Sequence, residues 1–299
     1  MKHKVVDVHY FEKLSPVFQG KWGRQLARLV IHFLAIDRVN KVYGRSCQYT
    51  GAAFTEGLLT DFGVNYRIGY AERLQHLPEG AFITVSNHPY GALDGIMLIH
   101  MMASIRPDYK IMVNQILTLI EAMNENFISV KPRIGDNPLN PSASFSGVKE
   151  ALLHLSEGHP MGFFPAGGVS FFDFKTMSIH DREWQESILK LIYKANVPVI
   201  PIRFFDGNSP FFYFLGIISW RIRSLRMAYE VFNKKRHKPR IGIGETITPE
   251  KIRSFNDVKE LGLFLRRQVY EMKKPTTWTP RMVIPLQREH HRRRAAKKK

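Results

Sequence analysis

The sequence predicts an α/β fold: a mixed, mostly parallel central sheet flanked by helices, with an N-terminal amphipathic helical segment. Short apolar runs alternate with segments of helical length from residue 61 onward, which is typical of parallel strands joined by helical crossovers. Residues 21–35 place apolar side chains on one face of a helix and basic side chains on the other. The 299 residues, 44% of them hydrophobic, are enough to fill the core of one large domain or two smaller ones.

We divide the chain into three parts. Residues 1–60 are expected to be helical and to lie at a membrane interface, because their amphipathic helix is basic and carries Trp22 at its edge. An ordinary surface helix packed on the domain fits the same pattern. Residues 61–275 hold the alternation of strands and helices and form the main domain. Residues 276–299 are expected to be a disordered basic tail, since 288–299 contain seven Lys or Arg residues and one acidic residue.

The composition limits the classes of partner. A formal net charge of +18 favours a polyanion, such as nucleic acid, an anionic membrane surface, an acidic carrier protein or a phosphorylated substrate. Cys47 is the single cysteine, which excludes an internal disulfide and a cysteine-based metal site. No apolar run reaches the roughly 18 residues of a spanning helix, and no secretory signal is visible. Any membrane contact is therefore expected to be peripheral.

The individual elements follow from the local patterns. The expected strands are residues 81–85, 109–113, 126–130, 197–205 and 241–245, together with one that begins at residue 161 and runs into a glycine-rich turn. The expected helices are residues 93–102, 115–123, 144–156 and 257–271. Pro198 and Pro201 each remove a backbone donor, so the strand that contains them should be an edge strand or locally irregular.

An apolar run at residues 211–220 is followed by eight Lys or Arg residues between positions 221 and 240. An apolar edge with a basic collar can rest on anionic lipid. The same charges fit an acidic acyl carrier protein, the phosphates of coenzyme A, or a basic face that is merely solvated. The pattern alone leaves these alternatives open.

One strand end carries the residues best suited to chemistry. Asn87 and His88 follow the strand 81–85, and Asp94 falls in the first turn of the next helix. Ligands of open α/β sheets bind at the carboxyl ends of strands. An imidazole there can take a proton from a hydroxyl or an amine, while a carboxylate on its other nitrogen stabilises the imidazolium. General-base catalysis is therefore predicted, although a turn histidine and a helix N-terminal acid fit the same residues.

A glycine-rich region forms the second candidate. Residues 161–170 run from a strand into Pro165, Gly167 and Gly168. Adjacent glycines let backbone N–H groups converge on an anion or an oxyanion. A structural tight turn explains these residues as well, so both readings stay open at this point.

Residues 87–95 resemble the first motif of the glycerolipid acyltransferases, the family of 1-acyl-glycerol-3-phosphate acyltransferase. That motif usually has four residues between its histidine and aspartate, whereas five separate His88 from Asp94. The spacing resembles a bacterial branch, often labelled hemolysin-like, that includes O-acyltransferases of ornithine and glycine lipids. Gly91 is flexible enough to bring Asp94 back to the imidazole. The resemblance covers roughly residues 80 to 245.

The glycine-rich region resembles the family's Phe-Pro-Glu-Gly-Thr-Arg-Ser motif, with matches at Phe164, Pro165, Gly167 and Ser170. The motif's glutamate, threonine and arginine are replaced by Ala166, Gly168 and Val169. The arginine of the preceding Phe-Ile-x-Arg motif is replaced by Val130.

These departures bear on the acceptor, because in the family the replaced residues help to hold its glycerol phosphate. A phosphate dianion strongly favours arginine. Their loss argues against that headgroup and favours the branch that acylates lyso-amino-acid lipids. Lys131 or Arg133 could compensate from neighbouring positions.

The resemblance implies that residues 61–275 are an acyltransferase domain. It would transfer a fatty acyl group from an acyl carrier protein or coenzyme A thioester to the hydroxyl of a lyso-lipid, with His88 as base and Asp94 orienting it. The residues expected to bind substrate are Asn87, Gly95, Lys131, Pro165, Gly167, Gly168 and Ser170. No metal and no bound cofactor are expected. The expected location is peripheral, on the anionic cytoplasmic face of the inner membrane.

Four alternatives accompany this prediction. A 1-acyl-glycerol-3-phosphate acyltransferase of phospholipid synthesis differs only in the acceptor. A basic nucleic-acid-binding protein agrees with the charge but shows no zinc-finger spacing and no RNA-binding aromatic signature. A hydrolase lacks an evident Gly-x-Ser-x-Gly nucleophile, and a metal site at His88 and Asp94 lacks a convincing third ligand.

Overall fold

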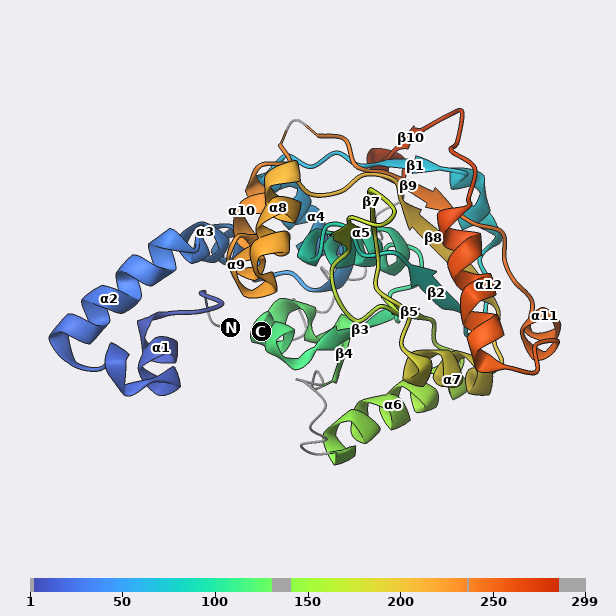
Figure 1. Ribbon diagram of the computed structural model, residues 1–299, viewed down its shortest axis with the longest axis horizontal. Helices are drawn as coiled ribbons and strands as arrows, with labels where there is room; N and C mark the ends of the chain where they lie inside the picture. Colours follow the sequence, from blue (N-terminus) through green and yellow to red (C-terminus); the bar gives the residue numbers. More distant parts are fainter. Residues whose placement is uncertain (1–2, 131–140, 236, 285–299) are drawn as a thin grey trace.

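A computed structural model describes residues 3–130, 141–235 and 237–284 of the chain (Figure 1). Lys131 and Arg133, which the sequence suggested as substitutes for the missing arginines, lie outside the described residues. Residues 285–299, which include most of the expected tail, also lie outside them.

The N-terminal part is helical, as predicted. It contains α1 (Val8–Leu14), α2 (Gly20–Phe33), α3 (Ile36–Ser46) and α4 (Gly51–Phe62). Ala35 adopts a left-handed conformation (φ 54°) that turns the chain between α2 and α3. In Figure 1, α1 and α2 extend away from the body of the molecule, whereas α4 lies inside it. The helix α4 packs against α5 (Ala92–Ala103), so it belongs to the core of the main domain.

The main domain is built on an eight-stranded sheet with the order β10-β1-β9-β8-β2-β5-β3-β4. The strands are β1 (Arg67–Gly69), β2 (Ile83–Ser86), β3 (Lys110–Asn114), β4 (Phe127–Val130), β5 (Met161–Phe163), β8 (Val199–Phe204), β9 (Arg240–Ile243) and β10 (Thr279–Pro280). The pairings of β8 with β9 and of β1 with β10 are antiparallel, and the other five strand pairings that the described residues form in this sheet are parallel. The predicted mixed, mostly parallel sheet is therefore confirmed.

Helices cover both faces of the sheet. One face packs on α4 and α5, and the other on α6 (Pro141–Ser156), α7 (Glu186–Ala195) and α12 (Val258–Tyr270). Alternate residues of a strand point to opposite faces. In β8, for example, Val199 belongs to the second core, whereas Ile200 and Ile202 belong to the first. The strand β2 lies between β5 and β8, and all three run parallel, so their carboxyl ends meet at one edge.

The predicted helix at residues 115–123 is wrong. The chain there forms two 3₁₀ segments, η3 (Gln115–Leu119) and η4 (Glu121–Asn126), separated by Ile120 with φ −88° and ψ 76°. The Asn126 amide donates to the Tyr109 carbonyl oxygen, which fixes the second segment beneath the start of β3. Tertiary contacts of this kind override the apolar pattern that suggested one continuous helix.

The prediction of an edge strand at residues 197–205 is also wrong, because β8 lies inside the sheet between β2 and β9. Its local irregularity is confirmed. Arg203 pairs with Gly242 of β9, but Val199 pairs with Ile247, so the register shifts by one residue between these points. Pro201 lies at this shift, where its carbonyl oxygen still accepts from Gly244 N at 2.7 Å. A bulge is the position at which an interior strand tolerates proline.

Part of the expected tail contributes to the sheet. β10 pairs with β1 through Thr279 and Ile68, and the Arg281 side chain is buried against α4, where it bonds Glu56. The described residues 276–284 therefore extend the fold beyond the predicted domain boundary at 275.

The apolar run after β8 forms α8 (Pro210–Ile218), followed by α9 (Trp220–Leu225) and α10 (Met227–Phe232). Several of its large apolar side chains are exposed, namely Phe211, Phe214, Ile217, Ile218, Trp220, Ile222 and Leu225. Within the residues that the structure describes, every helix is too short or too polar to cross a bilayer.

Candidate active site

The histidine motif forms a tight turn between β2 and α5. Gly91 adopts φ 79° and ψ −121°, a conformation that only glycine reaches readily. A side chain there would also collide with Met227, whose sulfur lies 2.6 Å from the position of a Cβ atom. The turn brings Asp94, in the first turn of α5, back beneath His88. The five-residue spacing is thus compatible with close approach of the two side chains.

His88 and Asp94 form an ion-pair contact, with 3.0 Å between Nδ1 and Oδ2. The carboxylate is fully buried, and its Oδ2 atom also accepts from Tyr90 N at 2.8 Å and Gly91 N at 2.9 Å. Burial raises the pKa of Asp94, while the contact with His88 and the two backbone donors oppose that shift. With Nδ1 on the carboxylate, Nε2 of His88 is the nitrogen left to exchange a proton with a substrate.

The turn is held by hydrogen bonds with the end of β8 and with the segment that follows it. Asn87 exchanges two bonds with the backbone of Phe204, donating to its carbonyl oxygen at 2.9 Å and accepting from its N–H at 2.8 Å. The Tyr213 hydroxyl donates to Pro89 O, and the Asn208 amide donates to Tyr90 O. The Asn87 side chain, predicted to bind substrate, is therefore committed to holding the turn.

The glycine-rich region combines a structural turn with an exposed backbone. Gly167, at φ 66°, donates its N–H to Phe164 O at 2.9 Å, and Pro165 O accepts from Gln185 N at 2.8 Å. These two predicted residues serve the turn. Gly168 lies on the surface with open space where a Cβ atom would stand, so its backbone is accessible to a ligand.

The ring of Phe164 lies against the His88 imidazole, with 4.1 Å between ring centroids and 31° between the planes. Phe164 follows β5 directly, and His88 lies just beyond the end of the neighbouring β2. The two motifs thus meet at the carboxyl edge of the sheet. This contact limits the orientation of the imidazole from one side.

Ser170 and Asp181 tie the two motifs together. Ser170 N donates to His88 O at 2.9 Å, and its hydroxyl donates to Asp181 Oδ1. The same carboxylate oxygen accepts from His88 N at 3.2 Å. The Ser170 side chain, predicted to bind substrate, is buried and bonded to Asp181, so it helps to hold the backbone of His88 in place.

Asp181 was missed by the sequence reasoning. It follows the hairpin of β6 (Phe171–Asp173) and β7 (Ser178–His180), and the Tyr270 hydroxyl bonds its backbone N–H at 2.8 Å. No sequence motif marks Asp181, because it supports the site by accepting from the backbone of His88, a residue 93 positions away in the chain.

Gly95 belongs to packing, since a Cβ atom there would lie 3.3 Å from the Ile111 side chain of β3. Lys131 lies outside the described residues. Among the residues that the structure describes, no group of three or more His, Cys, Asp or Glu side chains is placed to hold a metal ion.

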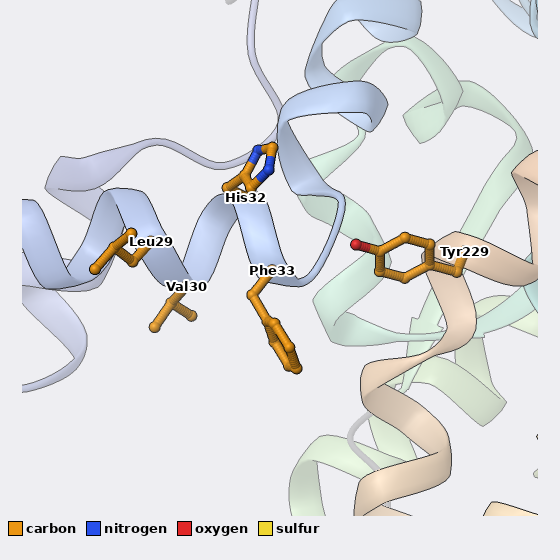
Figure 2. Close-up of a pocket in the computed structure, with 5 residues that line it drawn as sticks. All are labelled: Leu29, Val30, His32, Phe33 and Tyr229. Carbon is orange, nitrogen blue, oxygen red and sulfur yellow. The ribbon is translucent and has the colours of Figure 1, made fainter.

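A separate hollow of about 560 Å³ lies between α2 and α10, away from His88 and Asp94. Its lining consists of Leu29, Val30, His32, Phe33 and Tyr229. Figure 2 shows the Tyr229 side chain pointing from α10 toward α2. The hollow is open and mostly apolar, so it belongs to the exposed apolar surface of the N-terminal helices.

Comparison with known proteins adds the family. A family model described as "Acyltransferase" matches residues 13–277. Lyso-glycine lipid O-acyltransferases of Phocaeicola vulgatus and Bacteroides thetaiotaomicron are each 26% identical to this chain. The first match covers 87% of this chain and 94% of the relative, and the second covers 78% and 85%.

Among solved structures, the 1-acyl-sn-glycerophosphate acyltransferase PlsC from Thermotoga maritima matches with a TM-score of 0.49 at 14% identity. That match covers 88% of this chain and 92% of the other. Because the family match extends over most of the chain and includes both motifs at the sheet edge, this protein belongs to the acyltransferase family.

Proposed function

We propose that the protein is a peripheral membrane lipid O-acyltransferase. It transfers a fatty acyl group from an acyl thioester to the hydroxyl of a lyso-amino-acid lipid, with glycine as the favoured headgroup amino acid. The observation that carries the proposal is the contact between His88 and the fully buried Asp94, in a chain that belongs to the acyltransferase family.

His88 acts as the general base in this proposal. Its Nε2 takes the proton of the acceptor hydroxyl as the hydroxyl oxygen attacks the thioester carbonyl carbon. The new C–O bond forms, the C–S bond breaks, and the proton on His88 passes to the leaving thiolate. Asp94 stabilises the transient imidazolium through Nδ1. The exposed backbone at Gly168 is a candidate donor for the developing oxyanion.

The choice of acceptor has two supports. The family's two arginines and glutamate are replaced by Val130, Val169 and Ala166. Both curated relatives are named lyso-glycine lipid O-acyltransferases. A carboxylate headgroup carries less charge than a phosphate dianion, so it has less need of those arginines.

The membrane surface is proposed from α2 and the α8–α9 pair. Trp22 and Phe33 on α2 are 82% and 73% exposed, and Lys21, Arg24 and Arg28 are exposed on the same helix. Apolar side chains beside cations match a bilayer of anionic lipids. The hollow between α2 and α10 lies on this surface and offers an apolar lining to lipid chains.

The test is an acyl-transfer assay with purified protein in mixed micelles. We expect N-(3-hydroxyacyl)glycine to be converted to the diacylated lipid, with acyl carrier protein or coenzyme A thioester as donor in parallel reactions. Conversion of lysophosphatidic acid alone would reassign the acceptor to phospholipid synthesis. No transfer to either acceptor, from either donor, would overturn the proposed activity.

Nucleic-acid binding is tested alongside, with the full chain and with a chain that lacks residues 288–299. We expect DNA and RNA to bind weakly and only through the tail, because seven of its twelve residues are Lys or Arg. Sequence-specific binding that survives the deletion would favour the nucleic-acid-binding alternative.

A further inference from the structure

Arg223 of α9 has a buried guanidinium group beside the glycine-rich region. The residue is 8% exposed. Its Nη1 atom donates to Ser170 O at 3.0 Å, and its Nη2 atom lies 3.4 Å from Val169 O. In the described ranges 3–130, 141–235 and 237–284, no Asp or Glu side chain forms an ion pair with it. Both of its bonds go to neutral carbonyl oxygens.

A buried cation without an anionic partner is unfavourable, so such groups are normally paired. Burial lowers the pKa of Arg223, and the nearby positive charge of Arg182 lowers it further. Arg182 follows Asp181 directly and is exposed. Arg182 and Arg223 carry two positive charges against the single negative charge of Asp181, whose carboxylate accepts from the Ser170 hydroxyl, so one positive charge remains in excess.

This excess charge lies next to the proposed base. Ser170, whose carbonyl oxygen accepts from Arg223, donates its own N–H to His88 O. Val169 lies close to Gly91 of the histidine turn: its Cγ2 atom is 3.1 Å from the position that a Cβ atom would occupy if residue 91 carried a side chain. Position 169 is also where the family's motif carries the arginine that this chain lacks.

The guanidinium retains unused donors. Arginine has five N–H groups, and two of them suffice for the carbonyl bonds described above. The remaining donors form a planar fork that suits a carboxylate or phosphate oxygen pair. Phe212, whose ring centroid lies 5.4 Å from the guanidinium carbon, limits the movement of the fork.

We propose that Arg223, assisted by Arg182, binds the anionic headgroup of the lipid acceptor and takes over the role of the arginine missing at position 169. The inference rests on the proposed function and names a determinant of acceptor specificity. The shared chemistry is an oxyanion pair, which a carboxylate or a phosphate can supply. We assign the carboxylate.

The discriminating experiment compares an acceptor carboxylate with its neutral carboxamide. Transfer to N-(3-hydroxyacyl)glycine and to its glycinamide analogue is measured with the wild type, with Arg223→Gln and with Arg182→Gln. We expect the wild type to prefer the carboxylate by about ten- to a hundredfold in kcat/KM, mostly through KM. Arg223→Gln should lose this preference, and Arg182→Gln should reduce it in part.

A purely structural role for Arg223 makes a different prediction. If the guanidinium only clamps Val169 and Ser170, Arg223→Gln lowers transfer to both acceptors equally and the preference stays. Arg182→Gln guards against misfolding of the buried variant, because the Arg182 side chain is exposed. Arg267→Gln, at an exposed position of α12, is the matched control and should leave the preference unchanged.

The outcomes separate the two proposals. A wild type that acylates carboxylate and carboxamide equally well overturns the assignment of Arg223 but leaves the transferase activity standing. A wild type that acylates neither acceptor contradicts the proposed function itself. A parallel reaction with lysophosphatidic acid identifies the headgroup: if Arg223→Gln affects that acceptor and not the glycine lipid, the bound anion is a phosphate and the carboxylate assignment is wrong.

Discussion

The carboxyl edge of β2 and the outer face of α2 differ in which side chains they bury: the first buries a charged group, and the second exposes large apolar groups. At the edge of β2, a fully buried carboxylate is surrounded by an imidazole and two backbone donors. On α2, Trp22 and Phe33 expose most of their surface. A buried charge is stable only in the few geometries that supply it with partners. An exposed apolar face, in contrast, marks a surface that binds a membrane or another protein. We therefore expect catalysis from the rigid region at the edge of β2, and membrane attachment from the exposed face of α2.

His88→Ala tests the rigid region most directly. Loss of the general base should lower kcat by about 10³-fold, within the range that positioned bases contribute. Steady-state assays on the purified variant measure the effect, with circular dichroism as a check that the fold is retained. A folded variant that turns over at the normal rate would remove His88 from the mechanism.

Asp94→Asn should have the next largest effect. Its amide oxygen can still accept from Tyr90 N and Gly91 N, so the turn should persist. The imidazolium, however, loses its counter-charge, and we expect kcat to fall about 10²-fold while KM changes little. Asp94→Ala is the matched comparison. It should also lower the melting temperature, because both backbone donors lose their acceptor.

The histidine site could be predicted from sequence because its information is local. A strand end, a turn and a helix start determine where His88 and Asp94 meet. The same local reasoning failed for residues 115–123 and for the position of β8, where contacts from distant segments decide the outcome. It counted Arg223 among the basic residues of 221–240 but did not single it out, although Arg223 contacts Ser170 across 53 positions of the chain. Side chains that approach a site from a separate helix leave no spacing pattern to recognise.

A buried ion pair anchors α8, another helix with exposed apolar side chains, to the rest of the domain. Glu230 of α10 is 1% exposed, accepts from Ser209 N at 2.9 Å, and contacts Lys234 Nζ at 3.0 Å. Ser209 caps α8, so Glu230 connects the helix that carries Phe211 to the body of the domain. Burial of the carboxyl opposes ionisation, but these partners prevail and lower its pKa to about 2.

Glu230→Gln should therefore act on stability. The pKa of this carboxyl is lower in the folded state than its ordinary value of 4.5, so its stabilisation is fully present above pH 4.5. It is lost as the pH falls toward 2. We expect the variant to lose about 3 kcal/mol in the free energy of unfolding at pH 7, and less at pH 3. Denaturant titrations at both pH values measure this, and an equal loss at each would contradict the assigned charge.

The smallest effect is expected from the exposed face of α2, and only when a bilayer is present. Trp22→Ala and Phe33→Ala should each weaken binding to anionic vesicles about tenfold, because a buried aromatic side chain contributes about 1.5–3 kcal/mol and interfacial burial is incomplete. Sedimentation with vesicles that contain phosphatidylglycerol measures the loss. Transfer in detergent micelles should stay unchanged, since neither side chain contacts the β2 edge. Leu263→Ala, an exposed apolar position on α12, is the control. If all three variants bind alike, the membrane surface lies elsewhere, and the exposed apolar face of α2 must be assigned to a protein partner.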